Sequence, residues 1–279
     1  MEGLTYGLEL EWSDVDKRIE LPAGAEWNWD DYTIVNTDGH ANDPTGASYI
    51  YGAEINTTPT ATIDEQIAVV KELAELLNPA TTYRAALHVH IAYEPLIKDI
   101  NLLQQFFAYA LANENDFFRI AWRKTPYIGS PEQTKIANKW HTTNDRIFVG
   151  KVPPNRVKEI QQAKTPKEFY EAHAPFSEKT GKRVWHLSAR AGINMKSLFK
   201  HGTVEFRCFA GSHDPDEIKQ AMEWCEQFFI HALTDQLPVR QFKLPTKLPL
   251  CPPFNEIMEQ RYQATKFKGT TNGRSRISN

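Results

Sequence analysis

The sequence predicts an α+β protein whose strands present one apolar and one polar face. Three stretches alternate between apolar and polar side chains, at residues 4–11, 86–91 and 202–209. Because successive side chains of a strand point to opposite sides, each stretch hides an apolar face and offers a polar one. The segments between them carry apolar residues at helical spacing, which predicts amphipathic helices.

The polar faces of these three predicted strands carry pairs of ionisable residues. The pairs are Glu9 with Glu11, His88 with His90, and Glu205 with Arg207. Any single pair is compatible with an ordinary solvated strand face. Three such pairs on one chain favour a shared acidic surface that is able to hold a metal ion.

Composition argues against several classes of function. A chain of 279 residues allows one large domain or two small ones, and its net charge of −3 creates no strong field toward nucleic acid or membranes. No apolar run reaches the roughly 18 residues of a membrane span, and we expect no signal peptide, because the first residues carry no signal-peptide pattern. Three widely spaced cysteines, Cys208, Cys225 and Cys251, indicate a reducing compartment. We therefore expect a soluble, cytoplasmic protein.

The first third of the chain predicts a further strand and two helices. Residues 49–56 alternate as a strand that carries Glu54 on its polar face. Thr62 with Glu65 forms a capping box, which predicts a helix from there to about residue 77. A second helix is expected to begin after Pro95 and to reach about residue 122.

The middle of the chain is mostly polar. Residues 125–185 suggest an active-site cover or substrate loop rather than a separate domain. Within this region, residues 155–163 are amphipathic and residues 166–173 predict a short helix. Residues 183–188 and 191–195 predict a pair of strands that leads into the strand of Glu205.

The C-terminal part predicts two helices and a tail. Asp214 caps a long amphipathic helix that extends to about residue 233, and a last helix is expected at 254–265. The basic, Gly/Ser/Thr-rich residues 266–279 predict a disordered tail. We expect residues 1–265 to form a single catalytic domain.

Four carboxylates on predicted strand faces point to a cation. Glu9, Glu11, Glu54 and Glu205 would repel one another on one surface and take up protons unless positive charge lay between them. Hard divalent cations prefer oxygen ligands, and Mg²⁺ usually also binds substrate phosphates. Arg207 is placed to reach a phosphate oxygen or a developing negative charge. The chain contains neither of the glycine-rich nucleotide-binding motifs GxxxxGK(S/T) and GxGxxG. The carboxylates and Arg207 therefore predict a magnesium-dependent phosphate site that does not use a glycine-rich loop.

Several short motifs follow one another in a distinctive order. They are Gly7-Leu-Glu9-Leu-Glu11, Asp38-Gly39 before Gly52-Ala-Glu54-Ile, Leu87-His88-Val-His90-Ile, Asn194, and Thr203-Val-Glu205-Phe-Arg207 with Gly211. In this order and pairing the chain resembles the amidoligase family. That family belongs to the glutamine-synthetase-like carboxylate–amine ligases, together with the glutamate–cysteine ligases. The resemblance spans about residues 3–230 and leaves 125–185 largely unaligned.

The resemblance implies a fold and a set of ligands. The implied fold is a curved antiparallel sheet of the glutamine synthetase catalytic-domain type, with helices packed on its convex face. Its concave face would hold ATP and two or three Mg²⁺ ions, with Mn²⁺ as a substitute. The implied metal ligands form two groups: Glu9, His88 and Glu205 at the ATP phosphates, and Glu11 and Glu54 beside the acceptor carboxylate. The resemblance assigns no role to His90.

The resemblance also implies a reaction. A carboxylate attacks the γ-phosphate of ATP to give an acyl phosphate and ADP, and an amine then displaces phosphate to form an amide. The implied catalytic residues are Arg207, which would stabilise the transferring phosphoryl group, and Glu54. The residues expected to bind nucleotide or substrate are Arg123, Tyr127, Arg183, Asn194 and Arg207, although Arg123 equally fits a cation at a helix C-terminus. The substrates would be a small carboxylate such as glutamate and an amine, with a peptide or modified nucleobase as other acceptors.

Two other functions stay open at this point. A metal-dependent hydrolase would use His88, His90 and carboxylates to activate water. That function explains the two histidines better, but leaves Arg207 and the glutamates of the first strand less explained. A non-catalytic relative would bind a nucleotide or an amino acid, yet it would have no need for such a costly cluster of carboxylates. The sequence therefore favours the ligase.

Overall fold

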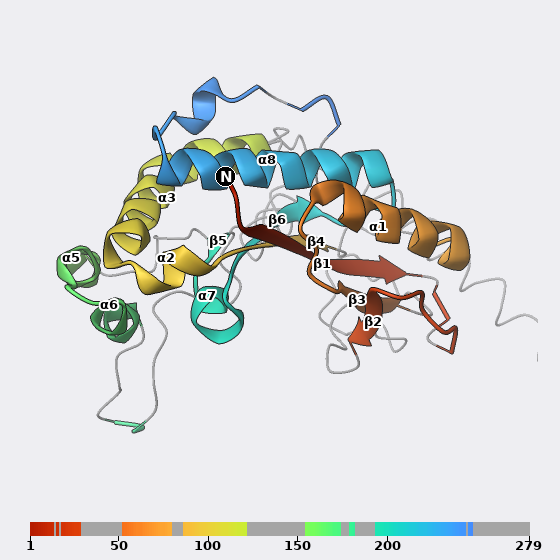
Figure 1. The fold of residues 1–279 in the computed structure, drawn as a ribbon, viewed down its shortest axis with the longest axis horizontal. Coiled ribbons are helices and arrows are strands. Elements are labelled where there is room, and N and C mark those ends of the chain that lie inside the picture. The colour runs from red at the N-terminus through yellow and green to blue at the C-terminus, as the bar shows by residue number, and fades with distance from the viewer. Residues whose placement is uncertain are drawn as a thin grey trace, which may run out of the picture.

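The computed structural model describes residues 1–13, 15–16, 18–28, 52–79, 86–121, 154–173, 179–181, 193–243 and 245–247. These residues form one antiparallel sheet with long helices against one of its faces (Figure 1). The predicted combination of helices with an antiparallel sheet is thereby confirmed, whereas the glutamine synthetase type of the fold stays a prediction. In the described parts of the chain, no helix is long and apolar enough to cross a membrane.

The sheet has six strands in the spatial order β2-β3-β1-β4-β6-β5, and every neighbouring pair is antiparallel. The strands are β1 (Leu4–Ser13), β2 (Ala25–Asn28), β3 (Gly52–Thr57), β4 (Ala86–Tyr93), β5 (Ile193–Asn194) and β6 (Thr203–Ala210). Within the described residues the sheet is open, with β2 and β5 at its edges. β1 and β4 therefore lie at its centre, next to each other.

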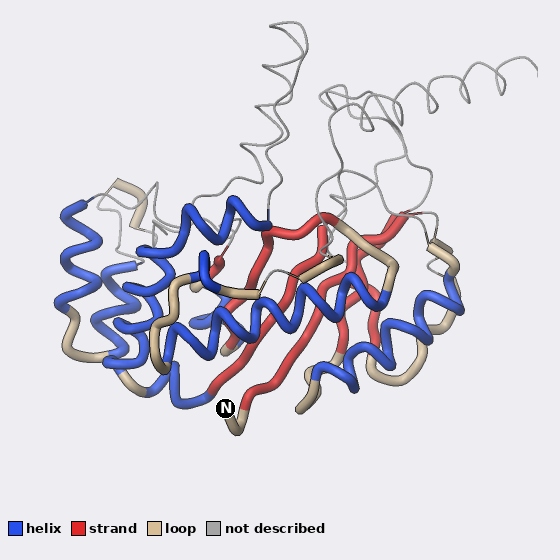
Figure 2. The backbone as a smooth tube through the Cα atoms, turned by 90° about the horizontal axis from the view of Figure 1, so that it is seen from above, coloured by secondary structure: helices blue, strands red, loops and turns tan. Residues whose placement is uncertain are grey.

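The predicted apolar strand faces form the hydrophobic core. On the central strands, Leu8 is 2% exposed and Val89 is fully buried, as is Phe206 on β6. Three long helices cover this face of the sheet (Figure 2): α1 (Ile63–Leu77), α3 (Ile100–Ala121) and α8 (Pro215–Leu233). The ring of Phe228 on α8 makes edge-to-face contacts with Phe106 on α3 and with Phe206 on β6. These contacts tie the helix layer to the sheet.

Several helix boundaries follow from local capping. Thr62 accepts a hydrogen bond from the backbone N–H of Glu65, whose side chain accepts one from Thr62, so the predicted capping box is confirmed at the start of α1. The Asp214 side chain caps α8 in the same sense, by accepting from the N–H of Asp216. The short helix predicted at 166–173 is present as α6 (Pro166–His173), and the amphipathic residues 155–163 lie largely in a further helix, α5 (Pro154–Gln162).

The structure differs from the sequence prediction in several short elements. The single helix expected after Pro95 is two helices, α2 (Glu94–Lys98) and α3, because Asp99 has extended backbone and its side chain accepts from the N–H of Asn101 at 2.8 Å. Three short elements were not predicted: β2, α7 (Lys196–His201) and the 3₁₀ helix η1 (Val239–Gln241). The strand expected at 183–188, the helix at 254–265 and the tail lie outside the described residues.

A β-bulge interrupts the pairing of β4 with β6. Because Phe209 pairs with Leu87, two residues of β6, Arg207 and Cys208, lie opposite the single residue His88. Phe209 therefore faces the helices, while Cys208 is also buried, as expected of a small apolar side chain. The bulge lies at the residues that the sequence singled out for chemistry.

Candidate active site

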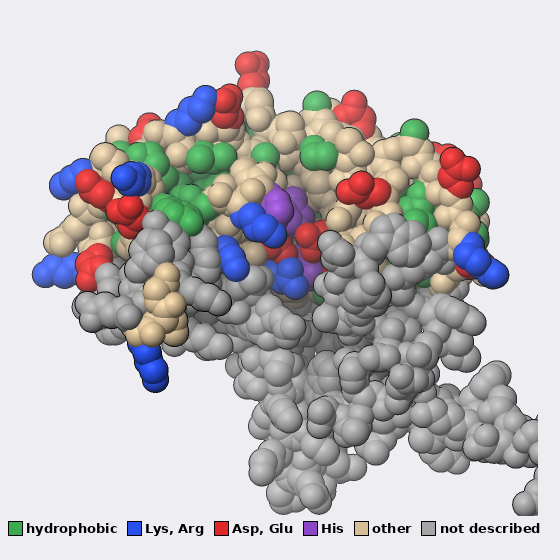
Figure 3. Space-filling model, turned by 90° about the horizontal axis from the view of Figure 1, so that it is seen from below, with side chains coloured by type: hydrophobic (Ala, Val, Ile, Leu, Met, Phe, Trp, Pro, Cys, Tyr) green, Lys and Arg blue, Asp and Glu red, His purple; other side chains and the backbone are tan. Residues whose placement is uncertain are grey.

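The ionisable residues gather on the face of the sheet opposite the long helices. Figure 3 looks onto this side, where histidine, acidic and basic side chains lie together near the middle. We call them the sheet-face cluster: Glu9 and Glu11 on β1, Glu54 on β3, His88 and His90 on β4, and Glu205 and Arg207 on β6. Four neighbouring strands thus contribute to one group of side chains.

This cluster is not an ordinary solvated strand face. Glu11 is 8% exposed, Glu54 3%, His88 2% and Glu205 4%. Removing charged carboxylates from water costs free energy unless they are hydrogen-bonded and paired, or bind a cation. The simple alternative of a solvated polar face is therefore wrong for these four residues.

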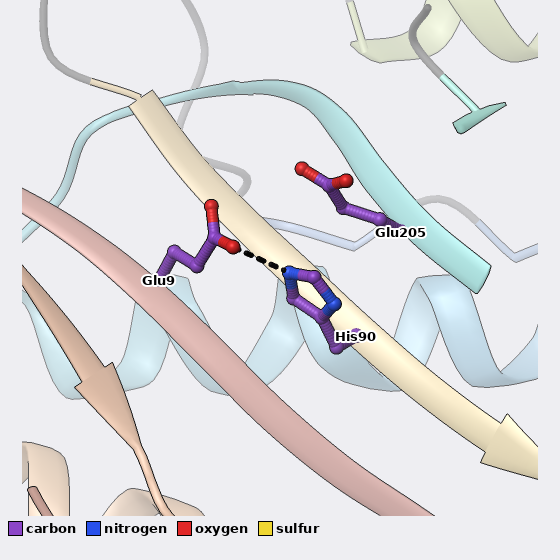
Figure 4. Close-up of side chains that lie close together, drawn as sticks. All are labelled: Glu9, His90 and Glu205. Carbon is purple, nitrogen blue, oxygen red and sulfur yellow. Dashed lines mark hydrogen bonds and ion pairs between the residues drawn. The ribbon is translucent and has the colours of Figure 1, made fainter. Parts of the chain in front are cut away.

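Strand register explains how the cluster assembles. On one side of β4, Glu9 lies directly opposite His88, and on the other side Glu205 lies directly opposite His90. The two glutamates therefore flank β4 from both sides, two residues apart along it. Figure 4 shows the carboxylates of Glu9 and Glu205 reaching over β4 toward the space beside the His90 ring.

Glu9, His90 and Glu205 form the group best arranged to hold a metal ion. Each offers one ligand atom, and these atoms all lie within 4.8 Å of one another. The resemblance had implied His88 rather than His90 as the partner of the two glutamates. The structure brings both histidines to Glu9, with His90 Nε2 at 3.1 Å from Glu9 Oε1.

His88 lies deeper, in the centre of the cluster. Its Nδ1 is 2.5 Å from Glu9 Oε2 and 3.7 Å from Glu205 Oε1, and its Nε2 is 3.8 Å from Glu11 Oε1. Burial, and then the charge of Arg207, lower the pKa of His88 below its ordinary value. His88 is therefore neutral at neutral pH, and its Nδ1–H donates to the Glu9 carboxylate, which can only accept.

Glu9 and His90 each stabilise the charged form of the other. Burial works to raise the pKa of Glu9, but the hydrogen bonds and charges of His88 and His90 outweigh it and hold that pKa well below its ordinary value. Burial also works against protonation of His90, yet Glu9 and Glu205 together raise the pKa of His90 above its ordinary value. Without a cation, the Nε2–H of His90 therefore donates to Glu9. A metal ion at this position would replace that proton.

Arg207 lies beside Glu205, on the β6 side of the sheet-face cluster. Its guanidinium donates a hydrogen bond to Glu205 Oε1 and is 3.9 Å from Glu9 Oε2. Burial opposes its charge, but Glu205 and then Glu9 and Glu11 raise the pKa of Arg207 above its ordinary value. Its side chain keeps 24% exposure. Arg207 is thus a permanent cation that contacts the buried carboxylates and still reaches solvent.

Glu11 and Glu54 form a second carboxylate pair beside the first group. They lie directly opposite each other on β1 and β3. The backbone N–H of Ala86 donates to Glu11 Oε2 at 2.7 Å, and the Asn28 side chain donates to Glu54 Oε1. Like charges in opposing positions repel, so a cation between these carboxylates would be favourable.

The remaining predicted site residues have different outcomes. Asn194 on β5 donates from Nδ2 to Glu205 Oε2 at 2.5 Å, and its Oδ1 accepts from the N–H of Lys196 at 3.0 Å. The structure thus places Asn194 as a support for Glu205, and its role toward nucleotide stays a prediction. Arg123, Tyr127 and Arg183 lie outside the described residues.

The donor set fits a hard divalent cation. Carboxylate oxygens are the ligands that Mg²⁺ and Mn²⁺ prefer, and imidazole nitrogen is a common ligand of divalent transition metals. Glu9 and Glu205 supply oxygens and His90 supplies nitrogen within one small space. The residues present therefore fit the metal that the sequence resemblance implied.

Comparison with known proteins identifies the family of the chain. The chain matches the family described as "Putative amidoligase enzyme" over residues 5–229, which is most of its length, and it belongs to that family. The matched range contains the whole sheet-face cluster. No protein of curated function and no solved structure matches the chain. Family membership supports a ligase-type function.

Two features of the site were missed from the sequence. Asn28 supports Glu54, but β2, which carries it, was not predicted as a strand. The family resemblance assigned no role to His90, although the His-Val-His spacing puts it beside His88 on the polar side of the strand. Alternation places His90 on the metal-capable surface, but its grouping with Glu9 and Glu205 depends on strand register.

Proposed function

We propose that the protein is an ATP-dependent carboxylate–amine ligase that forms an amide bond and releases ADP and phosphate. The observation that carries this proposal is the convergence of Glu9, His90, Glu205 and Arg207 on one face of the sheet of an amidoligase-family chain. Metal-capable ligands beside a permanent cation are what phosphoryl transfer from ATP requires, since its catalysis is mostly positioning and charge stabilisation.

The proposed cofactor is Mg²⁺, with Mn²⁺ as a substitute. Glu9, His90 and Glu205 would hold the ion at the ATP phosphates. His88 would keep Glu9 in place through the hydrogen bond from its Nδ1–H. Glu11 and Glu54 would hold a second ion near the acceptor carboxylate. When bound, the cations supply neutralisation of phosphate charge and help to align the two substrates.

The proposed reaction has two steps. A carboxylate oxygen of the acceptor attacks the γ-phosphorus, and the bond to the bridging oxygen breaks, which gives an acyl phosphate and ADP. The amine nitrogen then attacks the acyl carbon, the bond to the phosphate oxygen breaks, and the nitrogen loses a proton as the amide forms. Arg207 is close enough to Glu205 and Glu9 to face the transferring phosphoryl group. Its guanidinium would stabilise the charge that develops there.

The substrates follow from the reaction class. We propose a small carboxylate, with glutamate as the first candidate, and an amine. A peptide end or a modified nucleobase would also be compatible with this chemistry. The burial of Glu11, Glu54 and Glu205 beside a partly exposed Arg207 supports this proposal, because buried carboxylates favour a bound cation and Arg207 stays accessible to a substrate.

One observation also supports a metal-dependent hydrolase as a second candidate. Glu9, His90 and Glu205 would suit a water-activating metal as well as a nucleotide-bound one. The two functions differ in how metal and nucleotide binding are coupled, since only the ligase shares its metal with ATP.

Calorimetry distinguishes these two candidates. Mg²⁺ is titrated into the protein with and without a non-hydrolysable ATP analogue, after subtraction of Mg²⁺ binding to the analogue alone. The ligase predicts that the analogue tightens Mg²⁺ binding by a typical coupling factor of roughly 5- to 150-fold. Equal Mg²⁺ affinity in both titrations, with tight binding to the protein alone, would favour the hydrolase.

A further inference from the structure

Two hydroxyl side chains lie behind His90, on the side away from Glu9. His90 Nδ1 is 2.9 Å from Thr203 Oγ1, and Thr203 Oγ1 is 2.9 Å from Ser197 Oγ. Ser197 is 3% exposed, and the His90 side chain is 14% exposed. The imidazole is therefore held at both nitrogens, by a carboxylate at Nε2 and by a hydroxyl at Nδ1.

The fold brings these hydroxyl groups together through one tight turn. Ser197 lies in the first turn of α7, and Gly202 ends that helix with a φ of 79°. This left-handed conformation is one that residues other than glycine adopt at a cost. The chain then enters β6 at Thr203, whose side chain lies on the same side of the strand as Glu205. The hydroxyl pair is thus built into the α7–β6 connection.

A metal ion would impose one proton arrangement on His90. The nitrogen that faces Glu9 and Glu205 is Nε2, and it can bind a cation only through its lone pair. Nδ1 must then carry the ring proton and needs an acceptor, which Thr203 Oγ1 provides. The Thr203 hydroxyl can in turn donate to Ser197 Oγ, so that each polar group has a partner.

The Thr203 hydroxyl can also hydrogen-bond to His90 when no cation is bound. When the Nε2–H of His90 donates to Glu9, a neutral ring presents a lone pair at Nδ1, and the Thr203 hydroxyl can rotate to donate to it. A valine at the same position can do neither. The same ring orientation is therefore kept in both states, with only the protons rearranged.

We propose that Thr203, supported by Ser197, is a positioning residue that holds His90 with its Nε2 lone pair available to a cation between Glu9 and Glu205. The proposal rests on the cation site of the proposed function and assigns it a supporting hydroxyl pair. Partners of this kind behind a metal-binding histidine fix the ring and its tautomer.

The test compares Thr203→Val with Thr203→Ser. Valine keeps the shape of threonine and removes the hydroxyl, whereas serine keeps the hydroxyl. Binding of Mn²⁺ alone is followed by electron paramagnetic resonance. We expect Thr203→Val to weaken Mn²⁺ binding about 10- to 100-fold, as loss of such a partner typically does, and Thr203→Ser to bind like the wild type. Ser197→Ala should weaken binding in the same direction and by less, which provides a second test should the valine variant not fold.

A second measurement reports on the His90 ring itself. Long-range ¹H–¹⁵N spectra at saturating Mg²⁺, with His90 assigned through its loss in His90→Asn, show which ring nitrogen carries the proton. Wild type and Thr203→Ser should show a protonated Nδ1 and a free Nε2, and Thr203→Val should shift the proton toward Nε2. A purely structural role for Thr203 would change the thermal unfolding midpoint without this shift.

The outcomes separate the two proposals. Equal Mn²⁺ affinity and unchanged ring protonation in Thr203→Val, beside a wild type that binds Mn²⁺, would overturn the role of Thr203 alone. A wild type that binds no Mn²⁺, either alone or with the non-hydrolysable ATP analogue, would overturn the cation site as well. Weaker binding in Thr203→Val, restored by serine, would support both.

Discussion

The Glu205→Gln variant is expected to lose metal binding and ATP turnover while keeping its fold. Glu205 is 4% exposed, accepts hydrogen bonds from Asn194 and Arg207, and supplies a ligand atom to the group with Glu9 and His90. Glutamine keeps the size of this side chain and removes its charge. Loss of a ligand should reduce metal affinity by more than the roughly 100-fold that a supporting partner costs.

Three measurements check this prediction. Mn²⁺ binding is followed by electron paramagnetic resonance, ADP release by a coupled assay, and folding by the thermal unfolding midpoint. Glu94→Gln is a matched control, because Glu94 is an exposed carboxylate on α2 that pairs with Lys98 outside the cluster. Wild-type Mn²⁺ affinity and turnover in Glu205→Gln would show that Glu205 is not part of the site.

The Arg207→Ala variant is expected to lose turnover but to retain metal binding. Arg207 contacts Glu205 and lies 3.9 Å from Glu9, yet it offers no metal ligand. A guanidinium that stabilises phosphoryl transfer is typically worth about 10³- to 10⁵-fold in kcat. We therefore expect a loss of this size in ADP release, with Mn²⁺ affinity close to that of the wild type.

Two further variants sharpen the role of Arg207. Arg207→Lys keeps the positive charge and loses the planar set of donors, so its turnover should lie between those of Arg207→Ala and the wild type. Arg240→Ala on η1 removes an exposed arginine away from the cluster and should have no effect. If Arg207→Ala turned over ATP at the wild-type rate, the phosphoryl-stabilising role would be disproved.

The strand faces of this protein were predictable from alternation, whereas the partners across the sheet were not. Period-two patterning places Leu8, Val89 and Phe206 inside and the ionisable residues on the other side, and the structure agrees. Which histidine meets which carboxylate depends on register between strands distant in sequence. Register puts Glu9 opposite His88 and Glu205 opposite His90, so that both histidines reach the same carboxylate.

Short elements and long-range supports were beyond local sequence signals. The four residues of β2 form a strand because they pair with β3, and this pairing brings Asn28 to Glu54. The six residues of α7 are too few for helical periodicity to be visible. The bulge at Arg207 and Cys208 arises from pairing with β4, and its only local sign is that the apolar Cys208 and Phe209 follow each other. These features contribute the supporting contacts of the site.

The measurement that tests the ligase most directly is acyl-phosphate trapping by hydroxylamine. The protein is incubated with ATP, Mg²⁺, hydroxylamine and a panel of carboxylates that begins with glutamate, and ADP, phosphate and hydroxamate are measured. The proposed function predicts equal amounts of all three products with at least one carboxylate, and none from Glu205→Gln. Absence of hydroxamate across the panel, together with metal-dependent release of phosphate from simple esters, would contradict the ligase and identify a hydrolase.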